Sequence, residues 1–212
     1  MKLKSLLQTF AAVVVLGWSA VAAAQMPKAG VDYSIYDVPQ PTDAPAGKIE
    51  VTEFFFYTCP HCADMEPLLE KWAKAQPKDV SLRRVPVLFR PQLAPFAKLY
   101  YTLEAMNLLD RLQGEAFIAI HQQRVNLGDE KALLAWVTSK GVDAAKFSEV
   151  YNSFSVSSKV SRADQITRAH NIPGTPAMVV NGKYLVSQGD HARQLQVVDY
   201  LIAKIREEQK KK

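Results

Sequence analysis

Apolar runs in the first half of the chain predict two strands joined by a helix. The run at 49–57 (IEVTEFFFY) predicts a buried strand, and the run at 80–89 predicts a second one. Between them, apolar residues recur at the spacing of a helix face: Met65, Leu68, Leu69 and Trp72. Pro67 interrupts this helix, where it removes a backbone hydrogen bond and is expected to cause a kink. The proline-rich stretch before residue 49 contains one possible short edge strand, at 31–38.

The segment 92–170 has an entirely helical pattern of apolar positions. Two of its helices are marked by the residues Phe96, Leu99, Tyr100 and Leu103, and by Phe117 and Ile120. Asp129 is expected to cap a helix at 130–140 that ends at Gly141, and Asp143 to cap the next helix.

Strand signals return after this helical segment. Short apolar runs at 177–180 and 183–187 flank Asn181-Gly182, a strong hairpin signal. A final amphipathic helix carries the apolar residues Leu195, Val198, Leu201, Ile202 and Ile205. The pattern alone therefore predicts an α/β fold that contains an all-helical segment.

The first 24 residues have the pattern of a Sec-type signal peptide. Lys2 and Lys4 precede an apolar stretch at 10–21, which is followed by three alanines. We expect cleavage near Ala24/Gln25, with a retained membrane anchor as the alternative. Export would place the protein in the bacterial periplasm, where disulfides persist.

Length and charge limit the possible classes of protein. The chain has 212 residues, of which 48% are apolar, enough for one domain or for a domain with an insertion. The formal net charge is +5, and two of the basic residues lie in the predicted signal peptide. Three more lysines form the tail 210–212, which is expected to be solvated. No nucleic-acid-binding function is predicted.

The only two cysteines of the chain, Cys59 and Cys62, form the tetrapeptide Cys-Pro-His-Cys. A disulfide that closes so short a loop stabilises a fold by only about 2 kcal/mol, so redox chemistry explains the pair better than a structural role. A zinc site is disfavoured because there is no second Cys-x-x-Cys and the other histidines show no ligand spacing. Covalent haem would need a histidine directly after Cys62, where Ala63 stands.

The position of the motif at a strand-to-helix junction explains why one thiol should be reactive. Pro60 suits the first position of a helix, which makes Cys59 the N-cap. Its sulfur would then face free backbone N–H groups and the positive end of the helix dipole, which favour the thiolate. His61 can add a positive charge or a hydrogen-bond donor, and Cys62, one turn later, should be more buried and react second.

These residues resemble the thioredoxin superfamily and, within it, the DsbA family of periplasmic thiol:disulfide oxidases, whose characteristic motif is Cys-Pro-His-Cys. Three further positions match the superfamily pattern. Glu53, six residues before Cys59, corresponds to a buried acid, Pro67 to a helix-kinking proline and Pro176 to a cis-proline. The resemblance spans most of the chain after the signal peptide.

The resemblance implies a thioredoxin fold with an inserted all-helical domain. The domains would be a signal peptide at 1–24, a thioredoxin-like domain formed by 25–91 and 171–212, and a helical insertion at 92–170. The motif pattern and the family resemblance agree on this architecture.

The resemblance also implies an enzyme that donates its Cys59–Cys62 disulfide to newly exported or unfolded cysteine-containing proteins through a mixed disulfide. No metal and no cofactor beyond this disulfide are expected. A DsbB-type quinone-linked membrane protein would reoxidise the enzyme, which is expected to be a monomer. The alternatives are a disulfide isomerase or reductase on the same fold, or a non-enzymatic metal carrier or holdase.

Further site residues follow from the same comparison. Glu53 is expected to be a buried carboxylate that relays the proton of Cys62, with a solvent-facing position on an edge strand as the alternative. Thr175 with Pro176 would bind an extended substrate through the backbone of Thr175, and a simple loop is the alternative. The best-known oxidase of the family has valine at the position of Thr175, whereas threonine is commoner in the isomerase branch.

The remaining candidates have plainer interpretations. Glu66 is expected on the helix surface, although the family has an acid there that modulates the site. The family also has a lysine near these acids, for which Arg83 and Arg84 are uncertain counterparts. The other histidines, His121, His170 and His191, are expected to be surface or capping residues. Among the aromatic residues Phe56, Tyr57 and Phe89, core packing is the expected role of most, and a peptide-binding face is the alternative.

Overall fold

The strand β2 (Ile49–Phe55) lies inside a five-stranded mixed sheet, and all seven of its residues are buried. It pairs in parallel with β3 (Val80–Pro86) on one side and antiparallel with β4 (Ala177–Val180) on the other. β5 (Tyr184–Val186) and the edge strand β1 (Ser34–Ile35) complete the order β1-β5-β4-β2-β3. Because β2 has a neighbouring strand on each edge and helices over each face, all of its side chains are buried, which explains the apolar run in the sequence.

The computed structural model describes residues 26–210, so the predicted signal peptide lies outside it. Over these residues, no helix is long and apolar enough to span a bilayer. The helices are α1 (Pro60–Ala75), a 3₁₀ turn (Pro91–Leu93), α2 (Ala94–Ala105), α3 (Leu109–His121), α4 (Glu130–Ser139), α5 (Ala144–Tyr151), α6 (Phe154–Ala169) and α7 (His191–Lys210).

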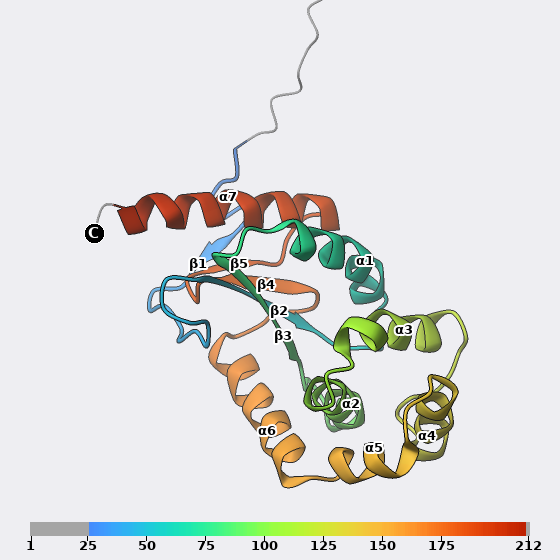
Figure 1. The fold of residues 1–212 in the computed structure, drawn as a ribbon. Coiled ribbons are helices and arrows are strands. Elements are labelled where there is room, and N and C mark those ends of the chain that lie inside the picture. The colour runs from blue at the N-terminus through green and yellow to red at the C-terminus, as the bar shows by residue number, and fades with distance from the viewer. Residues whose placement is uncertain (1–25, 211–212) are drawn as a thin grey trace, which may run out of the picture.

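The helices cover the two faces of the sheet separately (Figure 1). α1 and α7 lie over one face, where Ile49 and Val51 of β2 share a core with Met65 of α1 and Val198 of α7. On the other face, Phe54 belongs to a larger core that includes residues of α2 to α6. The motif at the end of β2 therefore lies where these two cores meet.

Helices α2 to α6 occupy the chain between β3 and β4, which confirms the thioredoxin fold with an all-helical insertion. The predicted caps are present: Asp129 Oδ1 accepts from Ala132 N at 2.9 Å, and Asp143 Oδ1 accepts from Lys146 N at 2.9 Å. The predicted hairpin is also present, with Asn181 at φ 51°.

Two details of the pattern-based prediction were wrong. The strand expected over 49–57 ends at Phe55, and the strand expected over 80–89 ends at Pro86. The apolar residues beyond these ends are loop residues, of which Phe89 is exposed. Leu68 fits the helical spacing of α1, yet it lies on the surface because the buried stripe of that helix runs through Met65 and Leu69.

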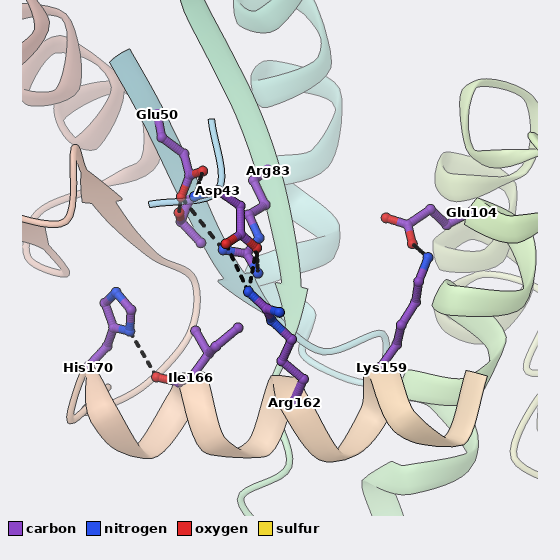
Figure 2. A network of polar contacts seen from close by, with 9 residues as sticks. Asp43, Glu50, Arg83, Glu104, Lys159, Arg162, Ile166 and His170 are labelled. Atoms are coloured by element: carbon purple, nitrogen blue, oxygen red, sulfur yellow. Dashed lines mark hydrogen bonds and ion pairs between the residues drawn. The ribbon is translucent and has the colours of Figure 1, made fainter. Parts of the chain in front are cut away.

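A network of polar contacts attaches the segment 36–48, which precedes β2, to both the sheet and the helical insertion (Figure 2). Asp43 accepts from Arg83 Nη2 on β3 at 2.9 Å and from Arg162 Nη2 on α6 at 2.9 Å. The backbone N–H of Asp43 donates to Glu50 Oε2 on β2 at 2.8 Å. One side chain of an irregular segment thus contacts both parts of the fold.

Candidate active site

Cys59 is the N-cap of α1, with φ −84° and ψ 117°, and Pro60 is the first residue of the helix. This is the arrangement predicted from the sequence. The Cys59 carbonyl accepts the first backbone hydrogen bond of the helix, from Ala63 N at 3.1 Å. Its sulfur is therefore held at the positive end of a 16-residue helix, where a negative charge is stabilised.

Hydrogen bonds lower the pKa of the Cys59 thiol to about 5. The largest contribution comes from the side chain of Cys62, and burial opposes it. The side chain of Thr175 and the backbone N–H groups of Cys62 and His61 lower the pKa further. Cys59 is thus a thiolate at neutral pH, which makes it a good leaving group in exchange reactions.

Cys62 lies one turn further along α1 and is fully buried, whereas Cys59 retains 5% exposure. Burial raises the pKa of the Cys62 thiol far above its ordinary range, and the hydrogen bond to Cys59 and the negative charges of Cys59 and Glu53 act in the same direction. The two sulfurs, both free thiols in this structure, are therefore strongly different. An incoming thiolate can reach only the first of them.

The loop before β4 lies against Cys59. The Thr175–Pro176 peptide bond is cis, as expected, and Cys59 Sγ lies 3.6 Å from the Thr175 carbonyl oxygen. Beside this loop is a cavity of about 530 Å³, lined among others by His61, Thr175, Pro176 and His191. The rings of His61 and His191 lie 6.2 Å apart. The reactive sulfur thus borders a hollow with backbone groups at its rim.

A buried charged cluster lies beneath the cysteines. Arg84 Nε donates to Glu53 Oε2 at 3.1 Å, and Arg84 Nη2 donates to Glu66 Oε1 at 3.0 Å. The other oxygen of Glu66 accepts from Gln113 Nε2 at 3.4 Å, and Gln113 Oε1 accepts from the Tyr57 hydroxyl. The burial predicted for Glu53 is confirmed, with 1% of the residue exposed.

The structure corrects the expected surface position of Glu66 and identifies the basic residue near the two acids. Glu66 is not on the surface: only 4% of it is exposed, because α1 turns this side chain inward towards β3. Arg84 is the basic residue near the two acids, since it lies opposite Glu53 in the parallel register of β2 and β3. Arg83, whose side chain points to the other face, pairs with Asp43 instead.

Burial raises the pKa of Glu53 to about 8, against the opposing charge of Arg84. Burial also raises the pKa of Glu66, while Arg84 and the hydrogen bond from Gln113 lower it. Among the described residues, Glu53 Oε1 has no hydrogen-bond partner. An unpaired buried oxygen on a carboxyl of high pKa suits a group that holds a proton at neutral pH.

The other histidines and the aromatic residues are placed as follows. His121 Nε2 lies 2.8 Å from the carbonyl oxygen of Tyr57, within hydrogen-bonding distance. His170 is at the C-cap of α6 as expected, but it is buried rather than on the surface. Tyr57 is in the core, and Phe89 is the most exposed of the three aromatic candidates, with Phe56 packed against its ring edge-to-face.

Sequence reasoning missed Gln113 and His191 as neighbours of the active site. Gln113 lies in a helix of the insertion, and nothing in the local pattern connects it with residues 47 and 56 positions away. His191 reaches the active site only because α7 starts beside the cis-proline loop. Within residues 26–210, no group of three or more histidine, cysteine or acidic residues is arranged to hold a metal ion.

Comparisons with known proteins agree with this geometry. Residues 50–201 match the family model "DSBA-like thioredoxin domain". A curated relative, the thiol:disulfide interchange protein DsbA of Bordetella parapertussis, is 46% identical over 200 residues, which cover 92% of this chain and 95% of the relative.

Solved structures are similar as well. The crystal structure of Pseudomonas aeruginosa DsbA has a TM-score of 0.83 and 36% identity, covering 88% of this chain and 98% of that one. The oxidoreductase DsbA from Xylella fastidiosa has a TM-score of 0.80 and 34% identity, covering 85% of this chain and 98% of that one.

Proposed function

This chain belongs to the DSBA-like thioredoxin domain family, and from that premise we propose that it donates its Cys59–Cys62 disulfide to newly exported proteins. It is a thiol:disulfide oxidoreductase of the DsbA type. The observation that carries the proposal is the difference between its two sulfurs, one with a pKa of about 5 and the other with a pKa raised far above its ordinary range.

In the first step, a substrate thiolate attacks Sγ of Cys59 in the oxidised enzyme. A bond between the substrate sulfur and Cys59 forms as the Cys59–Cys62 bond breaks, and the electron pair leaves on the sulfur of Cys62. Because the Cys62 thiol has a high pKa, this sulfur takes up a proton. The product is a mixed disulfide between the substrate and Cys59.

In the second step, another substrate thiolate attacks the substrate sulfur of the mixed disulfide, and Cys59 leaves as a thiolate. The substrate has then lost two electrons and two protons, and the enzyme disulfide has gained the two electrons. One proton stays on Cys62 and the other is released, because Cys59 remains ionised at neutral pH. The stability of this thiolate favours the reduced enzyme, so the disulfide form is a strong oxidant.

We propose that Cys62 exchanges its proton with the carboxyl of Glu53. Its carboxyl is buried, its charge raises the pKa of Cys62, and its pKa of about 8 lets it hold or release a proton near neutral pH. In the cis-proline loop, the backbone of Thr175 would pair with an extended substrate segment, since Pro176 lacks an N–H that would compete.

The alternative of an isomerase or reductase rests on Thr175. In this site the Thr175 side chain forms a hydrogen bond that lowers the pKa of Cys59. It therefore stabilises the reduced enzyme, which is the direction required of an oxidase. The residue that suggested the alternative thus supports the oxidase.

The setting of the reaction is part of the proposal. The predicted signal peptide would export the chain to the periplasm, where unfolded cysteine-containing proteins arrive. A quinone-linked membrane protein of the DsbB type would restore the disulfide, and the enzyme would act as a monomer. No cofactor beyond the Cys59–Cys62 disulfide takes part in either step.

Equilibration of the protein with glutathione buffers of known ratio tests the proposal. The fraction of molecules with the Cys59–Cys62 disulfide, counted by thiol alkylation and mass spectrometry, is expected to show a strongly oxidising couple. A reducing couple like that of thioredoxin would refute the oxidase and favour a reductase or isomerase. As a control, Cys59→Ser should neither oxidise a dithiol peptide nor form a mixed disulfide, whereas activity retained by this variant would contradict the mechanism.

A further inference from the structure

Helix α3 of the insertion reaches under the active site through the side chain of Gln113. This residue is 4% exposed, and its amide lies between two groups of the thioredoxin part. Its Nε2 donates to Glu66 Oε2 at 3.4 Å, and its Oε1 accepts from the hydroxyl of Tyr57, which precedes Cys59 by two residues. Because an amide has both a donor and an acceptor, one side chain satisfies two buried polar groups.

Arg84 links Glu66 to Glu53, because it forms an ion pair with each of them. Arg84 divides its N–H groups between the two carboxylates, at 3.0 Å from Glu66 Oε1 and 3.1 Å from Glu53 Oε2. Any change in the charge of Glu66 therefore changes how strongly Arg84 acts on Glu53. The four linked residues come from β2, α1, β3 and α3, so only Gln113 belongs to the insertion.

We propose that Gln113 is a positioning residue, through which the helical insertion sets the charge of the Glu53–Arg84–Glu66 cluster and hence the oxidising strength of the Cys59–Cys62 pair. This inference rests on the proposed function. It assigns a role in the redox reaction to a helix that contributes no residue to the Cys-Pro-His-Cys motif.

The direction of the effect follows from the charges. The hydrogen bond from Gln113 lowers the pKa of Glu66 and so helps to keep it ionised. An ionised Glu66 competes for Arg84 and repels charge on Glu53, which keeps the pKa of Glu53 high and its carboxyl protonated. A neutral Glu53 leaves the Cys59 thiolate without a negative neighbour below it.

The charged groups that face the cluster come from several elements. Glu66 faces Arg84 and, along α1, Glu70, and Glu53 faces Arg84, Glu66 and Cys59. The hydroxyls of Tyr57 and Tyr100 also lie near Arg84. Of these groups, Gln113 contacts only Glu66 and Tyr57 directly, so its effect on the cysteines must travel through one of the two.

The variant Gln113→Met tests the proposal, because methionine has a similar length but no hydrogen-bonding amide. Without the donor, Glu66 should become protonated more easily, Arg84 should serve Glu53 alone, and Glu53 should ionise. We expect the pKa of Cys59 to rise by about half a unit, and the equilibrium constant for oxidation of glutathione to fall about threefold. Both are measured on the full-length mature protein, by thiolate absorbance and by glutathione equilibration.

The double variant Gln113→Met/Glu66→Gln separates positioning from packing. If Gln113 acts through the charge of Glu66, its substitution should have no further effect on the couple once Glu66 is uncharged. Thr167→Val is the control: it removes a different buried polar group of the insertion, a hydroxyl that donates within α6 to the Ala163 carbonyl oxygen. It should leave the pKa of Cys59 and the equilibrium constant unchanged.

The inference would be overturned if Gln113→Met left the pKa of Cys59 and the glutathione equilibrium constant unchanged. It would also be overturned if the substitution changed them equally with and without the Glu66 carboxylate. Gln113→Leu, with the same expectation, replaces the methionine variant if the latter does not fold. A wild-type protein that proves to be a reducing couple would instead refute the proposed function. The two failures are therefore distinguished in the same set of measurements.

Discussion

At the scale of single residues, Cys59 combines a helix N-cap with hydrogen bonds from three neighbours. A helix terminus alone contributes up to about 1 kcal/mol at exposed sites, which is less than one pKa unit. The larger lowering of the Cys59 pKa therefore depends on its specific hydrogen bonds, above all that of Cys62. The second cysteine of the motif thus acidifies the first one as well as pairing with it.

The titration of Cys59 should be visible in the reduced protein. Thiolate absorbance is expected to rise with a midpoint near pH 5, because hydrogen bonds lower the pKa of this thiol to about 5. Cys59→Ser should lack this transition, and Thr175→Val should shift it to higher pH. A midpoint near the ordinary thiol value in the wild type would contradict the assignment of these hydrogen bonds.

The same pKa fixes how stability depends on pH. Cys59 binds fewer protons in the folded state than in the unfolded state, so its contribution to stability grows as the pH rises above about 5. That contribution is complete above the ordinary thiol pKa and is lost as the pH falls through about 5. Denaturant unfolding of the reduced wild type and of Cys59→Ser at several pH values should therefore diverge as the pH rises.

The charges beneath the cysteines mark the limit of prediction from sequence at this scale. The motif identified Cys59, Cys62 and the buried Glu53, because local spacing sets their positions. The inward turn of Glu66 and the choice of Arg84 over Arg83 depend on the register of β2 against β3. Register is a property of the assembled sheet, and one residue of slip would exchange the two arginines between faces.

At the scale of elements, the hairpin of β4 and β5 supports a crossing segment. The loop is formed by residues 181–183, since Val180 pairs with Tyr184. Asn181 and Gly182 both have positive φ, and Lys183 N donates to the Val180 carbonyl oxygen at 3.0 Å across them, as in the mirror-image turns that favour asparagine and glycine. The Gly182 carbonyl oxygen accepts from Gln40 N at 2.8 Å, so the N-terminal segment lies directly on the turn. A Cβ atom at Gly182 would lie 2.0 Å from the carbonyl oxygen of Gln40.

Gly182→Ala should therefore destabilise the protein strongly. The left-handed backbone costs about 1–2 kcal/mol for a residue with a side chain, and the overlap with Gln40 adds about 1–3 kcal/mol. Gly141→Ala is the matched control, since Gly141 also has a positive φ, of 72°, but faces open space. Urea unfolding should show only the smaller loss for this control, and equal losses would mean that Gln40 moves freely.

Element types were predictable from the chain because hydrophobic spacing and capping residues act locally. Asp129, Asp143 and the Asn181-Gly182 turn all occupy the positions that their chemistry favours. The strand ends were not predictable, because the apolar run continues beyond β3 although its residues no longer form backbone hydrogen bonds as part of the strand. Val87 still packs in the core, while Phe89 lies on the surface.

At the scale of the whole molecule, Asp43 connects three parts of the fold. It joins the N-terminal segment to Arg83 on β3 and to Arg162 on α6, the latter in the insertion (Figure 2). The side chain is 45% exposed, so each ion pair contributes little to global stability. Asp43 should instead affect local stability, namely how tightly residues 36–48 are bound to the sheet and to α6.

Asp43→Ala tests this role. Backbone amides of residues 36–48 should exchange hydrogen faster, while the free energy of unfolding should fall by no more than about 1 kcal/mol. Asp164→Ala, which removes an exposed pair with Arg168 inside α6, should leave the exchange of this segment unchanged. Hydrogen exchange followed by mass spectrometry measures both variants, and unchanged exchange in Asp43→Ala would show that Gln40 and the hairpin hold the segment unaided.

The complete fold exists here with both sulfurs unpaired, and the chain has no other cysteine. A disulfide that closes a loop of about four residues contributes only about 2 kcal/mol, so folding does not depend on a prior oxidation. A catalyst of disulfide formation that needed a disulfide to fold would depend on an earlier copy of itself. This chain avoids that circularity, because its only disulfide can form after folding and need not be supplied by an earlier copy of the same protein.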